Sequence, residues 1–226
     1  MTRPHDPRDL LAEGIDQLGI PDPAGARARL DTFMAEIERW NPRFGLVKYG
    51  DRDELVVKHV LDSLSAWSAV RDAAGSGGSV LDVGSGAGFP GIPLAVALPG
   101  LSFTLLERMA RRVSFLKTCT VIVGLPRTRV LRDDLAKVRE TFDVVTFRAV
   151  APLDRFLQEL EASGTAWRTV IAYKGREARV RQEAEDVRRL WGERYAVHIS
   201  PVTTPFLDEE RCLATLVRTD GTDRPD

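Results

Sequence analysis

The chain has 226 residues, of which 43% are hydrophobic and 29% charged, and its 32 basic and 33 acidic side chains leave a formal net charge of -1. This apolar content excludes disorder for the bulk of the chain, and no stretch reaches the ~20 apolar residues that a helix needs to span a bilayer. Near-neutral charge argues against a strongly basic nucleic-acid-binding protein. However, 27 of the basic residues are arginine, whose planar guanidinium suits phosphate. The positions of these arginines are therefore more informative than the net charge of the chain.

The first 75 residues are expected to form a helical N-terminal region. No apolar segment follows the charges of residues 1–8, so no secretory signal is predicted. Apolar residues recur at helical spacing after Asp22-Pro23, and this helix is expected to end at Asn41-Pro42. A second helical pattern covers residues 55–67. With only two cysteines and no targeting segment, the chain is expected to be cytoplasmic with reduced thiols.

Short β-branched segments alternate with helical patterns after residue 76. Strands are expected at 79–83, 103–107, 129–131, 142–147, 169–173, 194–200 and 211–218. Alternation of strands and helices predicts a Rossmann-like α/β fold, with a mostly parallel seven-stranded sheet and helices on both faces. The last two strands lack an intervening helix and are expected to pair antiparallel. Residues 76–219 would form this domain and 220–226 a flexible tail.

A glycine-rich loop follows the first expected strand. Gly84, Gly86 and Gly88 come directly after it, and Asp82 stands near its carboxyl end, where open α/β sheets bind ligands. The stretch 86–91 formally fits the dinucleotide fingerprint, but Pro90 removes an amide donor where a pyrophosphate needs one. The full D-x-G-x-G-x-G pattern is typical of S-adenosylmethionine-dependent methyltransferases, in which an acidic side chain near the loop pairs with the cofactor's ammonium group.

Acidic residues follow the next two strands. Glu107 ends the second strand, where a carboxylate accepts hydrogen bonds from ribose hydroxyls; the alternative is a solvated strand-end carboxylate. Asp133 and Asp134 follow the third strand, where methyltransferases place an acidic side chain near the adenine amino group. A cap on the following helix is the alternative for this pair, and the two roles are compatible.

Five segments between residues 40 and 175 carry a resemblance to a known family. They are Trp40-Asn41, the K-H-V-L-D-S-L run at 58–64, the loop 81–93 with G-F-P-G-I-P, the R-A-V-A-P-L run at 148–153 and Tyr173-Lys174-Gly175. The chain resembles the bacterial ribosomal RNA small-subunit methyltransferase G family, historically glucose-inhibited division protein B, which methylates N7 of one guanine in 16S ribosomal RNA. It departs from the family pattern at 44–47, where N-L-T is usual, and at Phe147, where serine is usual.

The resemblance implies a class I methyltransferase that uses S-adenosylmethionine without a metal. It assigns cofactor contacts to Gly84, Phe89, the Asp133-Asp134 pair and Arg148. A monomer acting on small-subunit ribosomal RNA or the 30S particle is expected. The alternatives are a methyltransferase for another substrate and a non-catalytic nucleotide- or dinucleotide-binding Rossmann protein.

Guanine N7 carries a free lone pair, so no general base is expected. Arg148 is the one candidate catalytic residue, with a contact to cofactor, carboxylate or phosphate rather than to a base that becomes cationic. Lys174, Arg176 and His59 are the candidate substrate-binding residues. His59 shares a helix face with Asp62 and Ser63, where packing or shaping of the target pocket is expected rather than a hydrolytic triad. Basic residues beyond the strand ends, as at 108–117 and 174–181, would form either a phosphate-binding rim or solvated helix faces.

Overall fold

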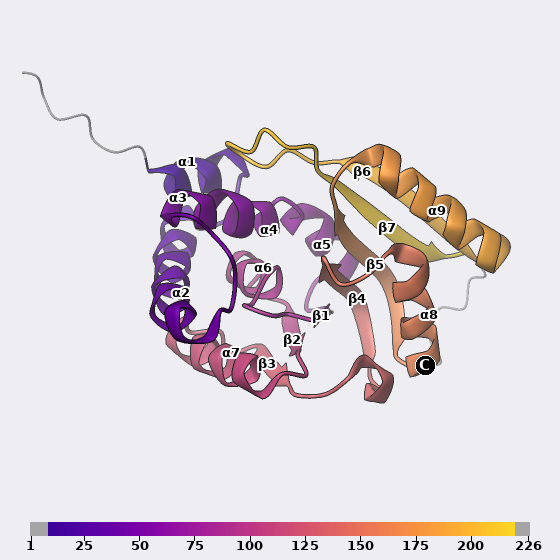
Figure 1. Cartoon of the computed structure of the whole chain (residues 1–226), viewed down its shortest axis with the longest axis horizontal. Coiled ribbons are helices and arrows are strands. Elements are labelled where there is room, and N and C mark those ends of the chain that lie inside the picture. Colours follow the sequence, from indigo (N-terminus) through magenta and orange to yellow (C-terminus); the bar gives the residue numbers. More distant parts are fainter. Residues whose placement is uncertain (1–8, 220–226) are drawn as a thin grey trace, which may run out of the picture.

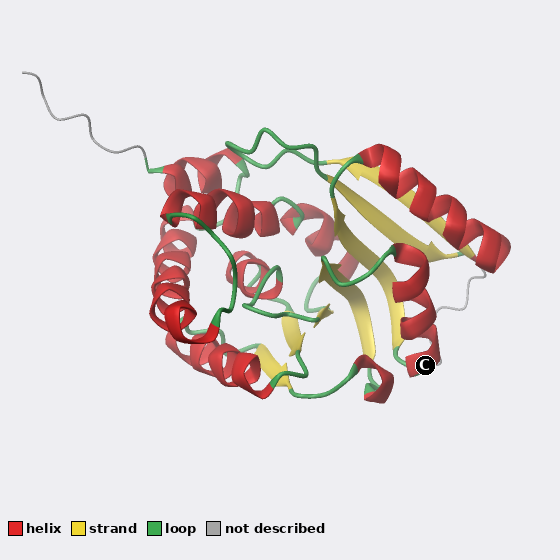
Figure 2. Cartoon of the chain, viewed as in Figure 1, coloured by secondary structure: helices red, strands yellow, loops and turns green. Residues whose placement is uncertain are grey.

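The computed structural model describes residues 9–219, and a seven-stranded sheet forms its centre (Figures 1 and 2). The strand order is β3-β2-β1-β4-β5-β7-β6. Strands β1 to β5 are parallel, and β7 runs antiparallel to both of its neighbours, so the expected mostly parallel sheet is confirmed. The strands are β1 (Ser79–Val83), β2 (Ser102–Leu106), β3 (Thr128–Leu131), β4 (Thr141–Arg148), β5 (Ala166–Lys174), β6 (Tyr195–Pro201) and β7 (Cys212–Arg218).

Helices cover both faces of the sheet, and a separate apolar core lies on each face. One core joins the N-terminal helices, α6 (Gly91–Ala97) and α7 (Ala110–Ile122) to the sheet. The other core packs α8 (Leu153–Ser163) and α9 (Glu177–Trp191) against the opposite face, on the right of Figure 1. Two short 3-10 turns, η2 (Leu135–Lys137) and η3 (Gly192–Arg194), complete this part of the chain. Within residues 9–219, no helix has both the length and the apolar character of a membrane span.

The N-terminal region is helical, as expected, but the long helix does not end at Asn41-Pro42. The elements are α1 (Leu10–Gln17), α2 (Pro23–Phe44), α3 (Arg52–Leu55), the π-helical η1 (Val56–Leu61), α4 (Asp62–Leu64) and α5 (Trp67–Ala74). Pro42 lies in the last turn of α2, and Gly45 ends the helix at φ +56 by donating its amide to Asn41 O. The expected domain boundary at residue 75 stays a prediction, and the expected tail lies outside the described residues.

Candidate functional site

The glycine loop joins β1 to α6 through three residues with left-handed backbone. Gly84, Gly86 and Gly88 have φ of +70°, +58° and +94°, which side-chain-bearing residues rarely adopt. A Cβ on Gly88 would lie 2.6 Å from an Ile92 carbon, and one on Gly84 would lie 3.0 Å from Val150. The Gly84 amide donates to Leu106 O at 2.9 Å, which holds the loop against the end of β2. The loop therefore presents bare backbone along one side of a cavity.

Asp82 lies beneath this loop and is fully buried. Its Oδ2 accepts the Gly91 amide at 3.1 Å, and its Oδ1 has no hydrogen-bond partner in the described part of the chain. Burial raises the pKa of Asp82 to about 7. The carboxylate thus ties β1 to the start of α6. Neither Asp82 nor Gly88 lines the cavities described below.

Glu107 connects the glycine loop to the start of α7. Its two oxygens accept the Gly86 amide at 3.1 Å and the Met109 amide at 2.8 Å. Since the residue is only 4% exposed, the alternative of a solvated carboxylate is wrong. In the Asp133-Asp134 pair, Asp134 Oδ1 accepts the Ala136 amide at 3.1 Å and so caps η2, which is the alternative role given above for this pair. Hydrogen bonding from the Asp134 amide lowers the pKa of the neighbouring Asp133.

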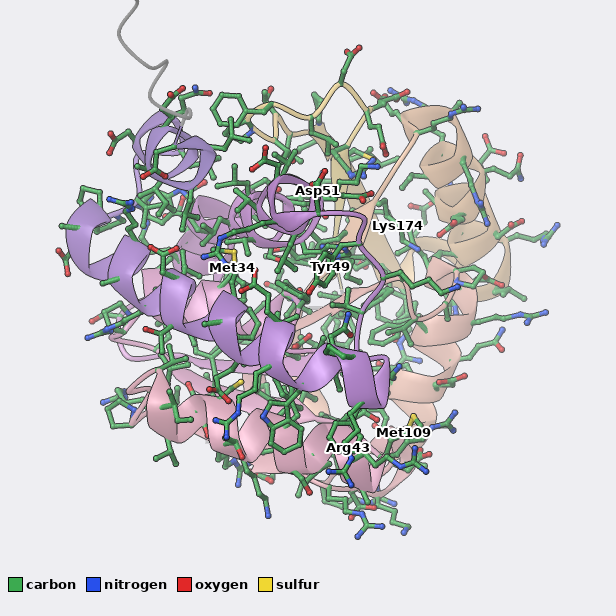
Figure 3. The ribbon with its side chains drawn as sticks, turned by 60° about the vertical axis from the view of Figure 1, so that its left-hand side comes forward. Met34, Arg43, Tyr49, Asp51, Met109 and Lys174 are labelled. Atoms are coloured by element: carbon green, nitrogen blue, oxygen red, sulfur yellow. The ribbon has the colours of Figure 1, made fainter. Side chains whose placement is uncertain are left out.

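Two cavities meet at the carboxyl edge of the sheet. The glycine-loop cavity, of about 660 Å³, is lined by Gly84, Gly86, Phe89, Glu107, Asp133 and Asp134 among others. Leu46, Val47, Arg108 and Met109 also border it. Figure 3 shows the loop that runs from the Arg43 end of α2 past Tyr49 to Asp51. The arginine cavity, of about 900 Å³, is lined by Lys58, Asp62, Tyr173, Lys174, Arg176, Arg179, Glu183 and Arg211 among others. Four residues line both cavities: His59, Arg148, Ala149 and Val150.

Arg148 ends β4 and is bound to the π-helical segment. Its Nη1 donates to Asp62 Oδ2 at 2.9 Å and to Lys58 O at 3.3 Å, and its guanidinium carbon lies 5.2 Å from the centre of the Phe89 ring. The second oxygen of Asp62 accepts from Arg211 Nε at 2.9 Å. One buried carboxylate therefore joins Arg148, the last residue of β4, to Arg211, the residue before β7. Sequence reasoning missed Arg211. A signal was available, because the start of an antiparallel strand lies beside the carboxyl ends of its parallel neighbours, and Arg211 directly precedes such a strand.

His59 lies between the two cavities as a neutral imidazole. Its Nδ1 is 3.3 Å from Arg148 Nη2, a permanent donor, so Nε2 carries the proton and donates to Lys48 O at 3.1 Å. Burial, followed by the Arg148 charge, lowers the pKa of His59. The Ser63 hydroxyl donates to His59 O, and Tyr173 donates to Ser63 O. The Ser63 hydroxyl is therefore bonded to the backbone rather than to the His59 imidazole.

The two other candidate substrate-binding residues lie in different environments. Lys174 is mostly buried, and its ammonium donates to Glu183 Oε2 at 2.7 Å and to Ala151 O at 3.1 Å. Arg176 is exposed at the border of the arginine cavity, and its guanidinium has no ion pair within residues 9–219. Sequence reasoning did not identify Glu183, because its hydrogen-bond partners, Lys174 and the Leu153 amide, lie on other elements.

Comparisons with known proteins agree with this architecture. Magnesium protoporphyrin IX methyltransferase from Synechocystis, solved with bound S-adenosylmethionine, has a TM-score of 0.53 and 18% identity over 86% of this chain and 97% of that chain. A human methyltransferase 10 domain containing protein has a TM-score of 0.57 and 13% identity over 84% of this chain and 97% of its own. The fold is therefore that of the Rossmann-like class I methyltransferases.

The sequence comparisons show the family. The family model described as rRNA small subunit methyltransferase G matches residues 26–205. A protein of this name from Treponema pallidum is 35% identical over 92% of both chains. Another, from Alkalilimnicola ehrlichii, is 40% identical over 74% of both chains. The chain belongs to the rRNA small subunit methyltransferase G family.

Proposed function

We propose that the protein transfers a methyl group from S-adenosylmethionine to N7 of a specific guanine in 16S ribosomal RNA. The observation that carries this proposal is the junction of two cavities at His59, Arg148, Ala149 and Val150. One cavity suits a nucleoside cofactor, and the other has a wall rich in arginine. We further propose that the protein acts as a cytoplasmic monomer on the ribosomal RNA or the 30S particle.

The residues of the glycine-loop cavity fit S-adenosylmethionine better than a dinucleotide. Pro90 has no backbone N–H, and the Gly91 N–H already donates to Asp82. A pyrophosphate would therefore lack hydrogen-bond donors at the start of α6. Glu107 and the Asp133-Asp134 pair supply acceptors for ribose hydroxyls and an adenine amino group. When bound, this cofactor supplies an activated methyl group on its sulfonium.

The chain's own residues would orient the reactants and exclude water. Guanine N7 needs no deprotonation, so the reaction does not require His59, whose ring nitrogens contact Arg148 Nη2 and Lys48 O, to act as a base. Arg148, the candidate catalytic residue, would maintain the wall beside Phe89 through its bonds to Lys58 and Asp62. Arg176 would contact RNA phosphate, while His59 and Lys174 would shape the arginine cavity.

Methyl transfer to small subunits tests the proposal. Subunits from a strain lacking the family's enzyme are incubated with purified protein and labelled S-adenosylmethionine, and the methylated base is mapped. Label at N7 of one guanine in 16S RNA is expected; label on another molecule would show a different substrate. Calorimetry should detect S-adenosylmethionine but not NAD, and the reverse result would overturn the cofactor assignment. An Arg148→Ala protein with unchanged cofactor affinity and activity would contradict the role of Arg148.

A further inference from the structure

The loop between β4 and α8, residues 149–152, has a conformation that needs support. Ala149 has φ +55, a left-handed backbone that is unfavourable for a residue with a Cβ. Val150 follows with 42% of its surface exposed, and both residues line both cavities. Pro152 then precedes α8 without a capping side chain. The loop therefore separates the two cavities while supplying little stabilisation of its own.

Glu183 supplies this support from α9. Its Oε2 accepts the Leu153 amide at 3.0 Å, so it caps α8 from another helix. The same oxygen accepts Lys174 Nζ at 2.7 Å, and Lys174 also donates to Ala151 O at 3.1 Å. Glu183 is 9% exposed, and the Lys174 ammonium lies 5.3 Å from the centre of the Phe147 ring. The Lys174–Glu183 ion pair thus holds both sides of Pro152, while the other Glu183 oxygen, Oε1, lies 3.7 Å from Nε of the exposed Arg179.

We propose that Glu183 is a positioning residue for methyl transfer, acting through Lys174 and the Leu153 amide on residues 149–152. This inference rests on the proposed function and gives Lys174 a role in holding the loop rather than in contacting phosphate. Two of the three Lys174 N–H donors are bound within the protein, to the buried Glu183 and to Ala151 O, and the side chain is only 11% exposed, which leaves the ammonium poorly placed for an RNA backbone. A shift of the loop would misplace the target base relative to the cofactor, and displacements of about 1 Å lower rates by up to about 100-fold.

The test compares Glu183→Gln with Glu185→Gln, which makes the same charge change at an exposed position of α9. Glutamine retains the shape of glutamate but not its charge, and a neutral acceptor binds the ammonium more weakly. We expect kcat to fall by about tenfold or more in Glu183→Gln, with KM for small subunits and its salt dependence unchanged. Lys174→Met should behave in the same way, and the double variant should be no slower than the slower single variant. Glu185→Gln should match the unmodified protein.

Equal kcat in Glu183→Gln and Glu185→Gln would overturn the inference. If Lys174 contacted RNA directly, Lys174→Met would instead raise KM, and the dependence of KM on salt concentration would fall by the amount expected for one lost phosphate contact. Glu183→Gln would then be unaffected. Amide hydrogen exchange at Leu153 gives a readout without activity: it should accelerate at least about tenfold in Lys174→Met, and unchanged exchange would also refute the idea, even if Glu183→Gln fails to fold. Inactivity of both the unmodified protein and Glu185→Gln would instead indicate failure of the proposed function.

Discussion

At the scale of single residues, the site depends on two buried carboxylates with different partners. Asp62 accepts from Arg148 and Arg211, so its charge is compensated by two cations. Asp82 is bound by one backbone amide, and one of its oxygens has no partner in the described residues. Burial therefore raises the pKa of Asp82, whereas Asp62 joins the end of β4 to the residue before β7. This difference could not be predicted from the sequence, in which both are aspartates beside apolar residues.

The raised pKa of Asp82 predicts that stability decreases as pH rises. Between its ordinary value of 3.8 and about 7, the folded state binds a proton that the unfolded state has lost. The stability present below the unfolded pKa is therefore lost as pH rises through the folded pKa, by about 4 kcal/mol in total for this group. Asp82→Asn, which cannot ionise, should show a flatter dependence. Urea unfolding at several pH values measures this, and parallel curves for the two proteins would contradict it.

At the scale of elements, sequence periodicity located the sheet better than it located the N-terminal segments. The expected strand 169–173 extends to Ala166–Lys174 because Trp167 pairs opposite Phe142 at the start of β4. By contrast, no local sequence pattern predicts the π-helical form of residues 56–61. It coincides with bonds to that segment from Arg148 and to Ser63 from Tyr173, partners that are distant in sequence. Long-range contacts of this kind also hid Arg211 and Glu183.

Asn41 shows how one such element reaches the site. Its side chain donates to Val47 O at 2.9 Å and accepts the Val47 amide at 3.0 Å. These bonds hold the segment after α2, in which Leu46 and Val47 border the glycine-loop cavity. Within the segment that departs from the family's N-L-T pattern, Val47 therefore places an apolar side chain beside the expected cofactor.

Asn41→Ala should loosen this segment and weaken S-adenosylmethionine binding. Loss of two hydrogen bonds of about 1 kcal/mol each predicts an affinity loss of up to about 30-fold, measured by calorimetry. Amide exchange at residues 46–50 should accelerate in the same variant. Thr32→Ala provides the control, because that hydroxyl bonds only within α2, to Ala28 O. Unchanged affinity and exchange in Asn41→Ala would show that the segment is held by its apolar contacts alone.

At the scale of the whole molecule, the net charge of -1 conceals an uneven distribution of charge around the site. The carboxyl edge of the sheet gathers the acidic acceptors of one cavity and the arginines of the other. Several of these arginines are paired with carboxylates, as Arg148 and Arg211 are with Asp62. A count of basic residues in the sequence therefore overstates the charge available to a polyanion. Exposed residues such as Arg176 and Arg108 are better placed for it.

Small-subunit binding should therefore depend on individual arginines at the cavity borders rather than on overall charge. Each arginine that neutralises one phosphate contributes about 0.7 to 0.9 to the slope of log affinity against log salt concentration. Arg176→Ala and Arg108→Ala should each reduce this slope by about that amount and weaken binding at low salt. Arg29→Ala removes the same charge from an exposed position that lines neither cavity, and it should leave the slope unchanged. If all three variants shift binding equally, long-range attraction governs binding, and the cavity borders are not the RNA-contacting surface.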